Sequence, residues 1–127
     1  MKTVDSEVSA VRKPSILVVD ADRLLRWSIC AHLASRYRIL AVATAVEAET
    51  LLASEQFEVV IVSSSVGGDT GLVELARARN PGARIIRFVT GTDSESRDPQ
   101  LTYIEKPFTF EILHRALSLF SPKSGTV

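Results

Sequence analysis

Five short apolar runs, separated by stretches with helical periodicity, constrain the fold of this chain more than any other feature of the sequence. Each run is rich in β-branched or other aliphatic residues, as expected for strands that are covered on both faces. Between the runs, apolar residues recur three or four positions apart, which indicates amphipathic helices. This alternation predicts an α/β fold with a parallel sheet, helices on both faces and right-handed crossovers. The five runs are residues 16–19, 39–43, 59–62, 85–89 and 101–104.

One interval breaks the alternation. Residues 91–100, GTDSESRDPQ, contain no large apolar side chain, so a helix there would have nothing to bury against the sheet. We expect a loop or at most a single turn, which leaves the fourth helix short or missing. The other helical stripes are Leu25, Ile29 and Leu33; Ala48, Leu51 and Leu52; Leu72, Leu75 and Ala76; and Ile112 or Leu113 with Ala116, Leu117 and Phe120.

The length of 127 residues fits one domain with a core of ordinary size. We expect a flexible N-terminal tail over residues 1–14, which ends at Pro14, and a folded domain over residues 15–121. A polar C-terminal tail then covers residues 122–127. No internal repeat divides the chain further.

Composition narrows the class of partner. Fifteen basic residues balance fifteen acidic ones, which gives no reason to propose nucleic acid or a membrane surface as the partner. The single cysteine, Cys30, excludes an internal disulfide and suits a reducing compartment, and its apolar neighbours favour a small buried side chain. There is no apolar stretch long enough to span a bilayer and no signal-peptide core, so we expect a cytoplasmic protein.

Polar residues stand where four of the predicted strands end. Asp20 follows the first strand, Ser63 the third, Thr90 the fourth and Lys106 the fifth, and Lys106 is followed by Pro107. In a doubly wound parallel sheet these ends meet in one crevice, which is where sites are built. The sequence therefore predicts a site made of an acid, two hydroxyls and a lysine, with Pro107 as a cis or turn proline.

These residues and their surroundings resemble the receiver domain of bacterial two-component response regulators. The resemblance covers roughly residues 15–120, and YIEKPF at 103–108 is its most specific part. The first matching segment, ILVVDADRLLRW at 16–27, is most similar to receivers of the nitrogen-regulator type. The other matching pieces are FEVVIVS with GDTGL, and IIRFVTG. The resemblance implies a flavodoxin-like fold with five parallel strands in the order 2-1-3-4-5.

The family's chemistry needs three carboxylates, and this sequence departs from the pattern at two of them. In receivers, an adjacent pair of acids after the first strand and an aspartate at the end of the third hold Mg²⁺, and that aspartate attacks a phosphohistidine. Here the adjacent pair is Asp20-Ala21, and the acceptor position is Ser63, whether counted along the strand or back from Gly71. A serine is a poor nucleophile without a nearby base. We therefore expect no aspartyl phosphorylation, no enzymatic activity and no cofactor, with Mg²⁺ binding weak or absent.

Other positions of the family pattern are retained. Thr90 and Lys106 match the residues that clamp the phosphoryl group, and Tyr103 matches the aromatic switch. Without a phosphoryl group, we expect Lys106 to pair with Asp20, Thr90 to hydrogen-bond in the crevice, and Tyr103 to pack at an edge. Asp22 completes the remnant acidic pocket with Asp20 and Ala21, but its position favours a helix cap.

Asp69 is the one candidate that could replace the missing acceptor, because it follows Gly67-Gly68 in a loop near the crevice; the alternative is a solvated loop acid. His32 is expected on the inner side of its helix, partly buried and hydrogen-bonded, since one histidine makes no metal site. Trp27 is either exposed to a partner or packed along the helix. Ser94 and Ser96 lie in an acidic loop that a kinase could reach.

We expect an atypical receiver that acts in signal transduction by binding protein partners, independently of phosphorylation. A small molecule in the old acid pocket is one way of controlling it. The alternatives are a working phosphorelay receiver with a non-standard acceptor, and the N-terminal receiver of a longer transcriptional regulator. The sequence leaves the identity of the partner open, and a homodimer stays open as well.

Overall fold

A computed structural model of the chain describes residues 13–91 and 97–118. They form one sheet of five parallel strands in the order β2-β1-β3-β4-β5, as predicted. The predicted fifth strand is shifted, because β5 begins at Thr102 rather than Leu101 and continues to Lys106. The strands are β1 (Ser15–Val19), β2 (Arg38–Val42), β3 (Val59–Ser63), β4 (Arg84–Thr90) and β5 (Thr102–Lys106).

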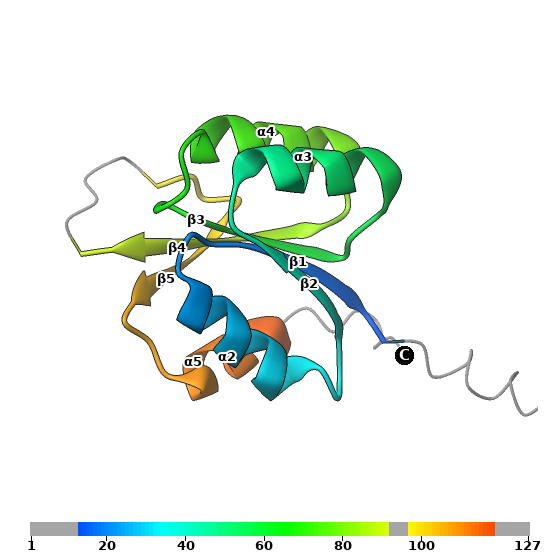
Figure 1. The fold of residues 1–127 in the computed structure, drawn as a ribbon. Helices are drawn as coiled ribbons and strands as arrows, with labels where there is room; N and C mark the ends of the chain where they lie inside the picture. Colours follow the sequence, from blue (N-terminus) through cyan, green and yellow to red (C-terminus); the bar gives the residue numbers. More distant parts are fainter. Residues whose placement is uncertain (1–12, 92–96, 119–127) are drawn as a thin grey trace, which may run out of the picture.

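Helices cover both faces of the sheet (Figure 1). The helices α3 (Ala45–Ser54) and α4 (Asp69–Arg79) pack side by side on one face, and α2 (Arg23–Leu33) and α5 (Phe110–Ser118) lie on the other. No helix is assigned between β4 and β5 in the described part of that connection, which excludes residues 92–96. The predicted tails lie mostly outside the described residues, as does Phe120.

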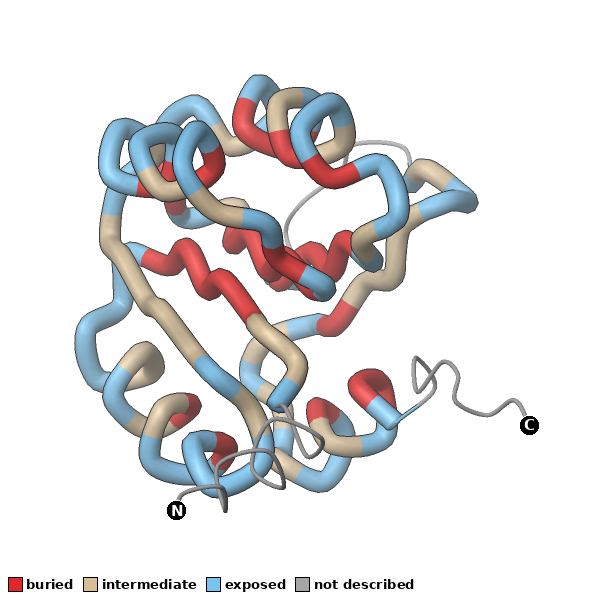
Figure 2. Tube along the Cα trace, turned by 90° about the vertical axis from the view of Figure 1, so that its right-hand side faces the viewer, coloured by how far each residue is buried: buried red, intermediate tan, exposed pale blue. Residues whose placement is uncertain are grey.

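The two faces of the sheet carry separate apolar cores, because successive strand residues point to opposite sides. Ile16, Val18 and Ile61 face α2 and α5, whereas Leu17 and Val60 face α3 and α4. All five residues of β3 are buried, which is typical of a central parallel strand, and Figure 2 shows this inner layer in red. Of the two candidates on the last helix, Leu113 is the core residue, since Ile112 is 44% exposed.

Side-chain caps fix where two of the helices begin. Asp22 is the N-cap of α2 and its carboxylate accepts a hydrogen bond from the amide of Leu25, as predicted. Thr44 and Glu47 form a reciprocal capping box at the start of α3. The helix α4 ends at its C-cap, Asn80. The side-chain oxygen of Asn80 accepts a hydrogen bond from the amide of Phe57.

The strand register places the predicted site at one edge of the sheet. Val19 is level with Val62, so Asp20 and Ser63, the residues that follow them, lie next to each other. On the other side Thr90 is level with Lys106. The carboxyl ends of β1, β3, β4 and β5 therefore meet as the sequence predicted. No helix in the described part of the chain is long and apolar enough to cross a membrane.

Candidate functional site at the strand ends

Asp20 is the centre of the site, and its side chain is fully buried. One carboxylate oxygen, Oδ1, accepts hydrogen bonds from the Asp22 amide at 2.9 Å and from the Ser65 hydroxyl at 3.3 Å. The other, Oδ2, has no hydrogen bond of regular geometry, but the ammonium nitrogen of Lys106 lies 2.9 Å from it. We take this contact as an ion pair, because charge attraction depends on distance far more than on angle. The predicted pairing of Lys106 with Asp20 is therefore present.

The three serines after β3 form a tight turn. Ser63 is fully buried at the strand end, and its carbonyl accepts a hydrogen bond from the amide of Val66 at 3.2 Å. Its hydroxyl accepts the amide of Ser65 at 3.1 Å and shares a hydrogen bond with the Ser65 hydroxyl at 2.9 Å. The Ser64 amide donates to the carbonyl of Phe88 in the neighbouring strand. The turn thus folds the Ser65 side chain back over the crevice.

Ser65 is the site residue that sequence reasoning missed. Its hydroxyl contacts Ser63, accepts the amide of Ala21 at 3.3 Å and donates to Asp20. A hydrogen-bonded chain therefore runs from Ser63 through Ser65 to the buried carboxylate. A signal existed, since serine hydroxyls commonly bond the backbone two residues further on, which is the turn seen here.

The retained clamp positions differ in their surroundings. Lys106 is 19% exposed and its ammonium is directed at Asp20. Thr90 ends β4 level with Lys106 and is exposed, so its predicted hydrogen bond in the crevice stays a prediction. The peptide bond from Lys106 to Pro107 is cis, one of the two forms expected for this proline.

The remnant acidic pocket holds one buried carboxylate. Ala21 is exposed and contributes a methyl group, while the Asp22 carboxylate caps α2. Arg26 adds a second cation, because its guanidinium donates to the carbonyl oxygen of Asp20 at 2.8 Å. Within the described ranges, no group of three or more His, Cys, Asp or Glu residues lies close enough together to hold a metal ion.

Both interpretations of Asp69 were wrong. It is the first residue of α4, and its carboxylate lies 2.7 Å from a guanidinium nitrogen of Arg87 in β4. The Asp69 side chain is itself 22% exposed and pairs with this buried guanidinium, so it is neither a solvated loop acid nor directed at the acceptor position. Tyr103 lies half-buried on the edge strand β5, where its hydroxyl accepts the amide of Asp98 at 2.8 Å.

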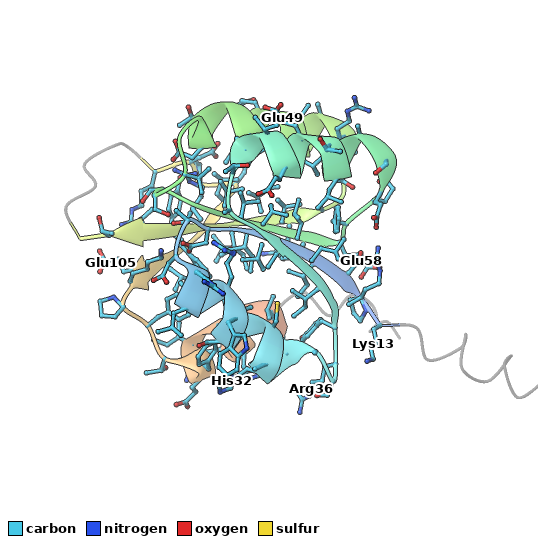
Figure 3. The ribbon with its side chains drawn as sticks, in the orientation of Figure 1. Lys13, His32, Arg36, Glu49, Glu58 and Glu105 are labelled. Atoms are coloured by element: carbon cyan, nitrogen blue, oxygen red, sulfur yellow. The ribbon has the colours of Figure 1, made fainter. Side chains whose placement is uncertain are left out.

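His32 is exposed rather than partly buried on the inner side of α2, and its ring stacks on that of Phe110 from α5 with centroids 3.9 Å apart. Figure 3 shows it on the side of α2 next to α5. Its Nδ1 lies 3.0 Å from the carbonyl oxygen of Ser28, so the predicted hydrogen bonding is present. Trp27 is 68% exposed, which argues against its packing along the helix, and contact with a partner there stays a prediction. Cys30 is half-buried, and burial raises the pKa of its thiol. Ser94 and Ser96 lie outside the described residues.

Comparisons with known proteins place this geometry in context. No family model matches the sequence, and no curated protein matches it significantly. Among solved structures, the chain is similar to a response regulator receiver protein from Sinorhizobium medicae, with 20% identity and a TM-score of 0.76 over 86% of this chain and 94% of that one. A CheY-like receiver domain protein from Methanospirillum hungatei gives 21% identity and a TM-score of 0.74, covering 86% and 94%.

A response regulator from Burkholderia pseudomallei, solved with a phosphorylated aspartic acid, a calcium ion and citrate, is also similar. It shares 25% identity with a TM-score of 0.72, over 83% of this chain and 66% of that chain. Together with the strand order, these similarities show that the chain has the CheY-like, flavodoxin-like fold of receiver domains.

Proposed function

We propose that this protein is an atypical receiver that transmits signals through protein–protein contacts, without phosphorylation of an aspartate. The observation that carries the proposal is the Asp20 cluster, defined as Asp20, Ser63, Ser65 and Lys106. In this cluster the strand-end hydroxyl and the buried Asp20 carboxylate are already bonded to neighbouring side chains. Hydrogen bonds to Oδ1 and the Lys106 ammonium beside Oδ2 thus engage the Asp20 carboxylate without a phosphoryl group.

The donor set of the crevice does not fit Mg²⁺. This ion demands near-octahedral coordination by hard oxygen atoms, with carboxylates to offset its charge. Asp20 supplies one carboxylate, and the ammonium of Lys106 at 2.9 Å already neutralises it. Ala21 supplies none, and Asp22 is engaged by the helix that it caps. We therefore propose that the protein works without a metal ion.

The nucleophile is also missing. Ser63 is buried and neutral, and a hydroxyl attacks phosphorus only when a base removes its proton. The chain through Ser65 does lead to a carboxylate, which is the one feature that favours the alternative of a serine acceptor. Lys106 already pairs with that carboxylate, with its ammonium nitrogen 2.9 Å from Oδ2. The Burkholderia regulator carries a phosphorylated aspartic acid, and this chain has no aspartate at the end of β3.

A partner of such a receiver recognises a surface that does not depend on phosphorylation. The surface around Tyr103 suits this role, because its hydroxyl is fixed by the Asp98 amide and the Arg97 guanidinium carbon lies 4.8 Å from its ring centroid. We place the proposed contact on this part of β5 and on the neighbouring α5. The proposal puts the protein in the cytoplasm and is neutral on whether the partner is a second copy of the chain.

The test is to incubate the protein with Mg²⁺ and acetyl phosphate, and separately with beryllofluoride. We expect no mass increase by a phosphoryl group and unchanged amide NMR signals for residues 63–66. A receiver with its aspartate intact serves as the positive control for the reagents. A phosphoryl adduct mapped to Ser63 or Ser65 by fragmentation would contradict the proposal and support the serine-acceptor alternative.

A further inference from the structure

A second concave site lies away from the Asp20 cluster, on the face of the sheet that α4 covers. It is a cavity of about 140 Å³ between α4, β4, β5 and the segment that precedes β5. Val73 and Arg77 of α4, Arg87 of β4 and Tyr103 of β5 line it, together with Leu101. No residue of the Asp20 cluster contributes to its wall. The cavity is open on one side, where residues of β5 are only half-buried.

Arg87 is the unusual residue of this cavity. It occupies the middle of a strand whose neighbouring residues, Ile86 and Phe88, are fully buried, and it is itself only 3% exposed. Burying a guanidinium is costly unless carboxylates or other acceptors surround it. Asp69 supplies one carboxylate at 2.7 Å but does not line the cavity. Arg87 itself lines the cavity, so its guanidinium, a planar group of five donors, both pairs with Asp69 and borders the cavity.

The second guanidinium, that of Arg77, is held by a contact that can be exchanged. Arg77 pairs with Oδ2 of Asp98, and the two side chains are 32% and 38% exposed. Exposed pairs of this kind contribute little to stability, about 0–1 kcal/mol. Asp98 keeps a partner if Arg77 leaves, because its Oδ1 accepts the amide of Gln100 at 2.8 Å. A ligand carboxylate that enters the cavity can thus replace the Asp98 carboxylate as the partner of the Arg77 guanidinium.

The other side chains that line the cavity include a tyrosine and two apolar residues, and they indicate what else a ligand needs. The hydroxyl of Tyr103 accepts the Asp98 amide, so among the described residues its own proton is available to a further acceptor. Val73 and Leu101 provide apolar contacts, while the acidic Glu74 is exposed and screened by solvent. The size suits a small ring, since a protein cavity of about 150 Å³ binds benzene.

We propose that this cavity binds a small organic carboxylate with a compact apolar body. The carboxylate contacts Arg87, Arg77 and the Tyr103 hydroxyl, and the apolar body packs on Val73 and Leu101. Such a ligand bridges α4, β4 and β5, and it contacts the same tyrosine that the proposed partner surface contains. The inference does not depend on the proposed function, because the cavity contains no residue of the Asp20 cluster and shares only Tyr103 with the proposed partner surface.

The test is an amide NMR titration of the full chain with sodium benzoate, at constant ionic strength maintained with sodium chloride. We expect saturable shifts at Asp98, Leu101 and Tyr103. Benzamide, which has the same shape without the charge, is expected to bind at least about tenfold more weakly, as the loss of charge-assisted hydrogen bonds implies. Equal shifts with benzamide, or shifts that do not saturate, would overturn the proposal.

Variants locate the binding. Arg87→Met is expected to weaken benzoate binding at least about tenfold, whereas Arg79→Met, an exposed position at the end of α4, leaves it unchanged. Removal of Arg87 also leaves the Asp69 carboxylate without this ion pair. A second measurement therefore uses Tyr103→Phe and Arg77→Met, which keep both Asp69 and Arg87. Benzoate binding that is the same in all three lining variants would show that the cavity is not the site.

Discussion

At the scale of single residues, the contact between Asp20 and Lys106 has a large expected effect on stability. The Asp20 side chain is fully buried, while Lys106 is 19% exposed. An uncompensated buried carboxylate is far less favourable than a lysine that can turn to water. The two partners of the ion pair therefore differ in what their removal does. Removing the lysine leaves the buried Asp20 carboxylate without a cation, whereas removing the aspartate leaves a lysine ammonium that water can solvate.

We predict that Lys106→Met lowers the free energy of unfolding by about 3 kcal/mol, since breaking a buried pair from one side costs about 3–5 kcal/mol. In an Asp20→Asn background the same substitution costs less than about 1 kcal/mol, because no buried charge is left behind. Urea unfolding of the four proteins of this cycle measures both values. Lys13→Met, at an exposed lysine that donates to the Ala34 carbonyl, is the matched control, with an expected change within about 0.5 kcal/mol. Equal costs of Lys106→Met in both backgrounds would show that the ion pair carries no coupling energy.

At the scale of elements, the capping box of α3 gives a prediction that depends on pH. Hydrogen bonds from the Ala43 amide and from the Thr44 side chain hold the pKa of Glu47 below its ordinary value. A carboxyl whose pKa is lower in the folded state adds stability above its unfolded pKa of about 4.3, and this is lost as the pH falls through the folded pKa. The contribution of Glu47 is therefore complete at pH 7 and disappears in acid.

Glu47→Ala is expected to lower the Tm at pH 7 by more than Glu49→Ala, and the difference should vanish below the folded pKa of Glu47. Both substitutions replace an exposed glutamate of the same helix by alanine, so helix propensity changes equally. Figure 3 shows Glu49 on the outer side of α3. Thermal melts between pH 7 and pH 2 provide the comparison. A gap that persists at the lowest pH would mean that Glu47 stabilises the helix by packing rather than by capping.

The elements themselves could be predicted from the sequence, because burial on both faces leaves unbroken β-branched runs such as residues 59–62 of β3. That the strand ends meet followed from the parallel topology, and with it the pairing of Asp20 with Lys106. Directions of side chains on turns could not be predicted in the same way. Ser65 contacts Asp20 because the turn after β3 folds it back; the serines favour such a turn, but they do not show where the Ser65 side chain points.

Arg87 shows a second reason why part of the structure could not be predicted, here its burial and its pairing with Asp69. In the sequence it is one charged residue inside an apolar run, and the run still indicated a strand. Its burial depends on Asp69, which lies 18 residues earlier and begins a helix on the same face of the sheet. Only the packing of that helix against β4 brings the two charges together. A partner supplied by tertiary packing leaves no local signal in the chain.

At the scale of the whole molecule, the response of global stability to divalent ions separates the proposed atypical receiver from a receiver that binds metal. A ligand that binds only the folded state raises its stability in proportion to the logarithm of its concentration. With one neutralised carboxylate in the crevice, the protein should gain nothing from Mg²⁺. We predict that millimolar Mg²⁺ leaves the Tm unchanged, relative to sodium chloride of equal ionic strength.

The double variant Ala21→Asp/Ser63→Asp is expected to behave in the opposite way. Two added carboxylates beside Asp20 repel one another, which raises their folded pKa values above the unfolded ones. The variant should therefore be less stable than the natural chain at pH 7, and should recover as the pH falls and its carboxylates are protonated.

Mg²⁺ should raise its Tm at pH 7, whereas Ala21→Asn/Ser63→Asn, which has similar volume without charge, should not respond. Scanning calorimetry of the three proteins measures these shifts. If Mg²⁺ raised the Tm of the natural chain as much as that of the carboxylate variant, the crevice would bind the ion with its own residues, and the proposal of a metal-free receiver would be wrong.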